Sequence, residues 1–263
     1  GVQIYANVLP SSRSVRIGTP ATAFASIVND GTATAANCTI VPTTEVPAAF
    51  TFQRTDPETN MAVGVQGQPA NVPAGGAETF VIGLTPSAAI NSQEVQFAFD
   101  CANSDPAPSV VGLNSLLLSA SATNEADIIA IVASSTNDGI ALVPGPSGLG
   151  FFTVAGINIG NGRSVVVQPV ANPGVPVGLS ICETTGTPDG SCLSAPGASQ
   201  RTTFLPNDVK TYTVFVQGNG TPIPMDLANS RVTVRFTTAD GVVRGATSIA
   251  VQTGAPGSLL ALQ

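Results

Sequence analysis

Residues 23–42 read AFASIVNDGTATAANCTIVP, and residues 151–171 read FFTVAGINIGNGRSVVVQPVA. Each stretch contains an alternating apolar run, an Asn-x-Gly turn (29–31 and 158–160) and a second apolar run. Alternation with a period of two residues is typical of strands that bury one face, and Asn and Gly are typical of the turns between strands. The two stretches therefore predict the same strand–turn–strand unit in both halves of the chain.

The similarity between the halves extends along the chain, which indicates an internal repeat. Four further pairs of segments match in the same order: VQIYANVLPSS (2–12) with DIIAIVASSTN (127–137), VPAGGAETFVIGL (72–84) with LPNDVKTYTVFV (205–216), EVQFAFDCAN (94–103) with RVTVRFTTAD (231–240), and VVGLNSLLLSAS (110–121) with VVRGATSIAVQT (242–253). Because residues 2–12 have a counterpart, we expect them to form the ordinary first strand of their half and not an added arm.

The predicted fold class is all-β, with two tandem antiparallel β-sandwiches. Turn signals recur about every 8 to 14 residues, as in sandwiches, while helical periodicity is absent. The boundary is expected near SATNEAD (121–127), with domain 1 over residues 1–122 and domain 2 over residues 123–253. Residues 254–263 have no clear counterpart after domain 1 and are interpreted as an apolar C-terminal tail.

Two short motifs occur in both halves. One is the Asn-x-Gly turn, and the other is a Pro and a polar turn followed by Thr and an aromatic residue at the beginning of a later strand (Thr79–Phe80 and Thr211–Tyr212). In these motifs the chain resembles the Ig-like domains of bacterial surface and secreted proteins, including the cell-adhesion-related type. The resemblance covers nearly the whole chain. It implies a seven-strand-like antiparallel sandwich in an exported protein, and it implies no active site.

The composition excludes several classes of function. Lys and Arg together number nine against 16 Asp and Glu, with Lys210 the only lysine, so the basic surface of a nucleic-acid-binding protein is missing. The chain has no histidine, which removes the commonest general base and the commonest metal ligand. No stretch approaches the roughly 20 apolar residues that span a bilayer. We therefore expect a non-enzymatic protein without a cofactor, a nucleic-acid partner or a membrane span.

Four cysteines, Cys38, Cys101, Cys182 and Cys192, allow three disulfide pairings. We favour Cys38–Cys101 and Cys182–Cys192, because the second pair encloses the short hydrophilic loop ETTGTPDGS. When the two halves are aligned, Cys38 and Cys101 correspond to Val167 and Thr238, so we expect the two domains to be cross-linked differently. An even number of cysteines and a first residue other than Met favour an exported, extracellular or cell-surface protein whose leader has been removed.

Other candidate sites lie in expected loops. Asp56, Glu58, Asp105, Asn137 and Asp138 could bind calcium, although no run matches a dense calcium loop, and turn hydrogen bonds are the alternative reading. The 16 carboxylates show no convergent pair for glycoside hydrolysis.

The sequences NCT (37–39) and NGT (219–221) fit the glycosylation sequon at Asn37 and Asn219. Of the two, Asn219 is expected to be the more accessible.

The tail contains SLLALQ (258–263), with Leu259, Leu260 and Leu262. These leucines could fold back on an edge of domain 2, or they could pack on a neighbouring subunit by strand addition. With one lysine in the chain the sheet edges have little charge protection, so edge pairing could be used for assembly. In that case the strand around Val2 and Ile4 is a second candidate contact.

The leading functional hypothesis is an exported structural subunit that forms an extracellular filament or surface polymer, as a homo-oligomer or homopolymer. The alternatives are a monomeric adhesion or ligand-binding region of a surface protein, and an accessory module of a secreted enzyme. The tail distinguishes them, because only the filament requires it.

Overall fold

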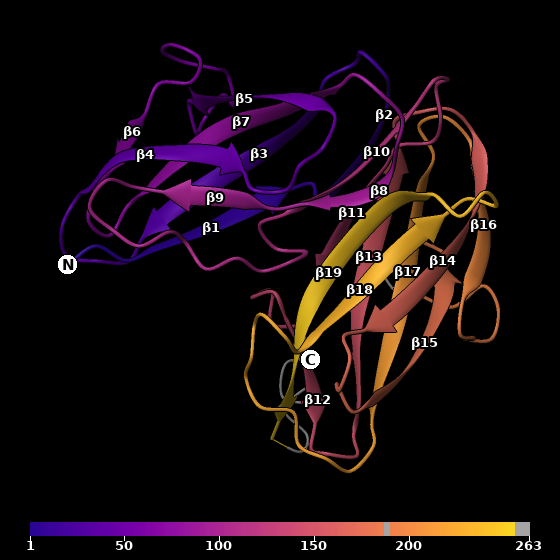
Figure 1. The fold of residues 1–263 in the computed structure, drawn as a ribbon. Helices are drawn as coiled ribbons and strands as arrows, with labels where there is room; N and C mark the ends of the chain where they lie inside the picture. Colours follow the sequence, from indigo (N-terminus) through magenta and orange to yellow (C-terminus); the bar gives the residue numbers. More distant parts are fainter. Residues whose placement is uncertain (187–189, 256–263) are drawn as a thin grey trace. The chain divides into compact units, whose positions relative to one another are not determined.

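The computed structural model describes residues 1–186 and 190–255, and it is all-β, which confirms the predicted fold class (Figure 1). No helix occurs among the described residues, and none of them forms a helix that could cross a membrane. The chain divides into two compact units, Gly1–Asn124 and a second unit that begins at Glu125. The division lies close to the boundary expected after residue 122.

The first unit is a sandwich of two sheets. One sheet has the strand order β1-β3-β7-β5. The other combines the orders β2-β10-β8 and β6-β4-β9, because β8 and β9 follow one another almost without a break. The strands are β1 (Ile4–Leu9), β2 (Ser12–Arg16), β3 (Ala21–Asn29), β4 (Ala35–Pro42), β5 (Ala48–Thr55), β6 (Ala70–Val72), β7 (Ala77–Pro86), β8 (Ile90–Val95), β9 (Phe97–Asp100) and β10 (Leu116–Ser121).

The second unit repeats this topology with one strand in place of two. Its sheets have the orders β11-β13-β17-β15 and β12-β19-β18-β14-β16, in which β18 takes the place of β8 and β9. The strands are β11 (Ile128–Ala133), β12 (Ile140–Pro144), β13 (Leu149–Asn158), β14 (Arg163–Ala171), β15 (Val177–Thr184), β16 (Gln200–Phe204), β17 (Val209–Gly218), β18 (Arg231–Thr237) and β19 (Val243–Gly254). Both units are Ig-like sandwiches, and they lie in tandem along the chain.

Each unit has more strands than the seven expected from the resemblance. The first strand is split in two, so that β1 pairs antiparallel with β3 while β2 pairs parallel with β10. The second unit splits its first strand in the same way, between β11 and β12. Short strands, β6 and β16, are added at the far edge of the second sheet. The antiparallel sandwich therefore includes one parallel pair in each unit.

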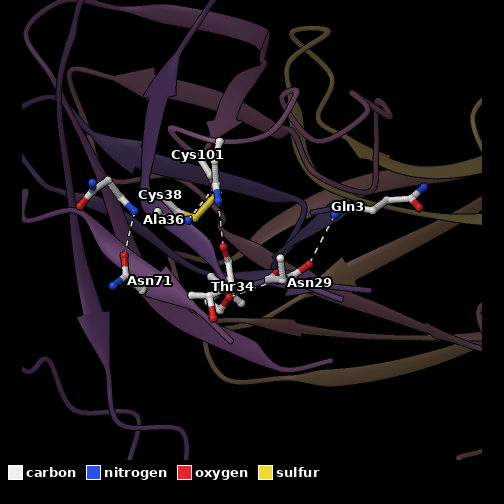
Figure 2. The surroundings of a disulfide bond; sticks show 11 residues. Gln3, Asn29, Thr34, Ala36, Cys38, Asn71 and Cys101 are labelled. Atoms are coloured by element: carbon white, nitrogen blue, oxygen red, sulfur yellow. Dashed lines mark hydrogen bonds between the residues drawn. A yellow bond between two sulfur atoms is a disulfide. The ribbon is translucent and has the colours of Figure 1, made fainter. Parts of the chain in front are cut away.

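The Asn-x-Gly turn is explained by the side chain of its asparagine. Asn29 is fully buried; its Oδ1 accepts hydrogen bonds from the Gly31 amide (3.0 Å) and the Gln3 amide (3.4 Å) (Figure 2). Its Nδ2 donates to the carbonyls of Ala33 (2.8 Å) and Val72 (3.1 Å). One amide thus joins the chain before β1, the β3–β4 turn and the end of β6.

Asn158 repeats this arrangement in the second unit. Its Oδ1 accepts from the amides of Asp127 and Gly160, both at 3.0 Å. Its Nδ2 donates to the carbonyls of Asn161 (2.8 Å) and Leu205 (3.4 Å). A Cβ at Gly160 would overlap the Glu125 carbonyl, so only glycine allows this close approach.

Each sandwich buries its own core. The aromatic residue after the repeated threonine, Phe80 or Tyr212, is fully buried in both units. The threonines themselves hydrogen-bond across neighbouring strands, Thr55 to Thr79 at 2.9 Å and Thr184 to Thr211 at 2.6 Å. The second motif of the repeat therefore places one ring in the core and one hydroxyl pair across two strands.

Candidate assembly site

The first feature of the site is how the sheet edges are covered. The outer edge of β5 is covered by residues 61–67, which follow it in the chain: the Val63 amide donates to the Arg54 carbonyl (2.8 Å) and the Gly67 amide to the Phe52 carbonyl (2.7 Å). Covering an edge in this way prevents pairing with another chain.

The outer edge of β15 is covered by the corresponding segment, residues 191–197. The Leu193 amide donates to the Glu183 carbonyl (2.8 Å), and Gly197 and Ile181 exchange two backbone hydrogen bonds (2.8 and 3.0 Å). The disulfide Cys182–Cys192 fixes the beginning of this segment. Both units thus cover the same edge with their own chain.

The opposite edge of the first sheet, at β1, is different. Val8 donates its amide to the Leu113 carbonyl (2.9 Å), but nearer the N-terminus the edge borders a hollow of about 330 Å³. The hollow is lined on one side by Val2, Gln3, Ile4 and Tyr5, and on the other by Asp105, Pro106 and Pro108. We call it the β1 groove.

The wall of the β1 groove is the long connection from β9 to β10. The beginning of this connection is fixed by a disulfide and by side-chain hydrogen bonds. The disulfide Cys38–Cys101 ties it to β4, and the Asn103 side chain accepts from the Ala36 amide (2.8 Å) and donates to the Thr34 carbonyl (2.9 Å) (Figure 2). Both disulfides are the pairs that the sequence favoured.

The middle of the wall is held by two further bonds. The Ala107 amide donates to the Phe99 carbonyl (2.9 Å), and the Asn114 side chain donates to the Pro108 carbonyl (2.8 Å). The wall is therefore held in place by specific hydrogen bonds within the first sandwich.

The second unit has no such wall. Its corresponding connection is the tight turn Thr238–Val242, closed by a hydrogen bond from the Thr238 amide to the Val242 carbonyl (3.0 Å). The difference between the two connections is visible in the sequence, because SDPAPS (104–109) has no equivalent between residues 240 and 242 when the two halves are aligned. A long loop beside a scaffold strand is where binding surfaces commonly occur.

The outer face of the same sheet is apolar beside the groove. Tyr5 (43% exposed) lies opposite Val28 in the β1–β3 register, and Leu9 lies opposite Phe24. All four side chains are exposed. The β1 edge thus has apolar surface on the groove side and on the outer face.

A second hollow, of about 260 Å³, lies in the second unit on the sheet that contains β11, β13 and β17. Small side chains line much of it, including Ala133, Thr153, Ala155 and Thr213. None of the described residues that line it is charged. β11 is the edge strand of the second unit that corresponds to β1 in the first. The β11 edge therefore serves as the control for the β1 edge within the same chain.

The predicted contact residues are placed as follows. Ile4 is 3% exposed and its side chain packs in the core of its own sandwich, so a contact by the strand around Ile4 would use the backbone of β1; that contact stays a prediction. Val2 is partly buried against the same core. Gly254 pairs with Pro144 in β19, so the second domain extends into the predicted tail. Leu259, Leu260 and Leu262 lie outside the described residues.

Two of the candidate calcium ligands, Asp56 and Asp138, serve as turn residues. Asp56 accepts from the amides of Glu58 (2.8 Å) and Thr59 (3.1 Å), and these bonds lower the pKa of its carboxyl group. Asp138 accepts from the Thr136 hydroxyl (2.6 Å), which lowers the pKa of Asp138. Within residues 1–186 and 190–255, no group of three or more Asp, Glu, His or Cys side chains converges.

The two sequons differ in their surroundings. Asn219 is exposed in a turn, where its Oδ1 accepts from the Thr221 amide (3.2 Å). Asn37 is also exposed, but it lies in β4 beside the buried Cys38, and its amide donates to the Asn71 side chain (2.9 Å) (Figure 2). Glycosylation of either residue stays a prediction.

Comparison with known proteins finds neither a matching family model nor a matching curated protein. Among solved structures, the chain is similar to the secreted serine protease VesC from Vibrio cholerae (9% identity, TM-score 0.27, 83% of this chain) and spans 46% of that chain. It is also similar to BcpA, the major pilin subunit of Bacillus cereus (10% identity, TM-score 0.30, 95% of this chain and 70% of that one). A third is a chaperone–tip adhesin complex of CFA/I fimbriae (11% identity, TM-score 0.26, 92% of this chain and 98% of that one). Similarities at these TM-scores carry no argument about function.

Proposed function

We propose that this chain is an exported, non-enzymatic structural subunit whose copies assemble into an extracellular filament or surface polymer. The contacts are made by the β1 edge of the first sandwich and by the apolar segment around Leu259, Leu260 and Leu262. The observation that carries the proposal is the β1 groove. The chain covers the outer edges of β5 and β15 with its own segments, but it leaves part of β1 beside a hollow.

The location outside the cell is supported by the two disulfides. Disulfides form and persist in oxidising compartments and are rare in the cytosol. Here they tie down the wall of the β1 groove and the segment that covers β15.

The polymer form is supported by the asymmetry of the two units. The walled groove occurs in the first sandwich, whereas the apolar segment follows the second, so a contact between them joins two different surfaces. Contacts of this heterologous kind propagate into open filaments when the rotation between copies does not close a ring.

The proposal is tested by sedimentation velocity over a range of protein concentrations. We expect the wild-type chain to form species that grow with concentration, and we expect Tyr5→Lys to reduce them because it places a charge at the apolar β1 edge. Phe151→Lys is the matched control, since Phe151 is an aromatic residue of the second unit that is 39% exposed. A wild-type chain that stays monomeric at every concentration would contradict the proposal.

The groove also favours a second candidate, an adhesion domain that takes a strand from a different protein. In that case the wild-type chain stays monomeric, and Tyr5→Lys weakens binding to the ligand instead.

A further inference from the structure

The backbone of β1 determines which groups face the groove. The Asp30 amide of the turn after β3 donates to the Gln3 carbonyl (2.8 Å), while the Val8 amide points the other way, to the Leu113 carbonyl (2.9 Å). Because hydrogen-bonding direction alternates along a strand, the amides of Ile4 and Ala6 face away from β3, as that of Val8 does.

Three successive residues of the wall offer no N–H donor to the Ile4 and Ala6 carbonyls. Pro106 and Pro108 lack an N–H group, and the amide of Ala107 between them is donated to the Phe99 carbonyl. A strand from elsewhere can therefore pair with the Ile4–Ala6 stretch.

The surroundings define the composition of that strand. One of its faces would meet the groove with Val2, Pro106 and Pro108, and the other would continue the exposed face with Tyr5 and Val28. The strand therefore needs apolar residues on both faces. Among the described residues that line the groove, Asp105 is the only charged one, so the strand also needs little charge.

Residues 258–263 of the chain match this description. In an extended strand Leu260 and Leu262 share one face and Leu259 and Ala261 the other, and the segment SLLALQ contains no charged side chain. The eight residues 256–263 that follow the described chain would span about 26 Å when extended, which exceeds the roughly 20 Å of the six-residue strand β1.

We propose that residues 258–263 of one copy add as a strand to β1 of a second copy, beside Pro106 and Pro108. This inference rests on the proposed function and names its contact. The other described edge strands fit less well: β2 carries Arg13 and Arg16, β16 carries Arg201, and β6 is only three residues long. β12 (IALVP) is apolar but ends in Pro144, which has no N–H group. β11 is the longest rival with an equally apolar sequence, IIAIVA.

The test uses two complementary variants. Ala6→Pro removes an outward amide of β1 and keeps residues 258–263, while a chain that ends at Gly254 keeps β1 and lacks the segment. Proline is tolerated in an edge strand where its missing N–H faces outward, and thermal unfolding checks that each variant is folded. Ala130→Pro makes the matched change in β11, because Ala130 lies opposite Gly156 at the position that corresponds to Ala6.

We expect each blocked variant alone to be monomeric in light scattering after size-exclusion chromatography, and we expect their mixture to form a 1:1 dimer. Ala130→Pro should assemble as the wild type does. A peptide of sequence PGSLLALQ should bind the truncated chain, and Ala6→Pro in that chain should weaken binding about tenfold.

Four results would overturn the inference. If both blocked variants still assemble, other surfaces make the contact, and of the proposed function only the assembly into a polymer survives. If Ala130→Pro blocks assembly and Ala6→Pro does not, the receiving strand is β11. If the blocked variants are monomeric but their mixture forms no dimer, the segment acts within its own chain. If the wild-type chain is itself monomeric, the proposed function fails as well. The double variant Leu260→Asp, Leu262→Asp leaves β1 unchanged and should be monomeric, as the truncated chain is. If Ala6→Pro does not fold, this double variant replaces it in the test.

Discussion

At the scale of single residues, the two repeats are organised by Asn29 and Asn158. Each is fully buried and uses one amide group to hold three backbone segments that lie far apart in sequence. The sequence showed the Asn-x-Gly pattern twice and predicted a turn correctly. It could not show the bond from Asn29 to Val72, because that contact depends on how β6 is placed in the folded unit.

Replacing either asparagine should therefore destabilise its unit. Asn29→Ala and Asn158→Ala each leave buried backbone groups without partners, and each should lower the free energy of unfolding by about 3 kcal/mol. Asn7→Ala is the control, because Asn7 is exposed and only accepts a hydrogen bond from Ser26; it should change stability by less than about 0.5 kcal/mol. Urea unfolding measures all three, and equal effects at Asn29 and Asn7 would contradict the interpretation.

The turn at Asp138 should depend on pH. The hydrogen bond from the Thr136 hydroxyl lowers the pKa of Asp138 below its ordinary value of 3.8. Because the pKa is lower in the folded state, this contribution to stability is complete above the unfolded value and is lost as the pH falls through the folded one. Asp138→Asn should therefore lose less unfolding free energy than the wild type between about pH 5 and pH 2.5. Parallel curves for the two proteins would show that the turn does not contribute.

At the scale of elements, the strands of both sandwiches could be predicted from the repeat, whereas their order in the sheets and the coverage of the sheet edges could not. Alternation identified the strands because each buries one face. It could not identify the covering segments 61–67 and 191–197, which are irregular and pair along one side only. The same alternation points the Ile4 side chain into the core, which leaves the backbone of β1 as the part of that strand that could make a contact.

The two disulfides should differ in their importance for the β1 groove. Cys38–Cys101 closes 63 residues and Cys182–Cys192 closes 10, so loop entropy predicts losses of about 4 and about 3 kcal/mol on removal. Replacing Cys38 and Cys101 by Ala should also speed amide hydrogen exchange in residues 101–108 and weaken assembly. Replacing Cys182 and Cys192 should speed exchange at 191–197 instead, and exchange that changes in neither segment would contradict these roles.

At the scale of the whole molecule, assembly should respond to salts as an apolar contact does. The described lining of the β1 groove contains one charged residue, Asp105, so raising sodium chloride from about 0.1 to 1 M should not dissolve the polymer by screening. Sulfate, which strengthens apolar burial, should lower the concentration at which assembly begins. Light scattering across both salts measures this, and dissolution by sodium chloride would indicate an ionic contact.

Copies of this chain should assemble through residues after Gly254. Negative-stain microscopy of the purified chain, beside a chain that ends at Gly254, is the decisive measurement. We expect filaments from the full chain and single particles from the shortened one. Single particles from both, or filaments from both, would contradict it.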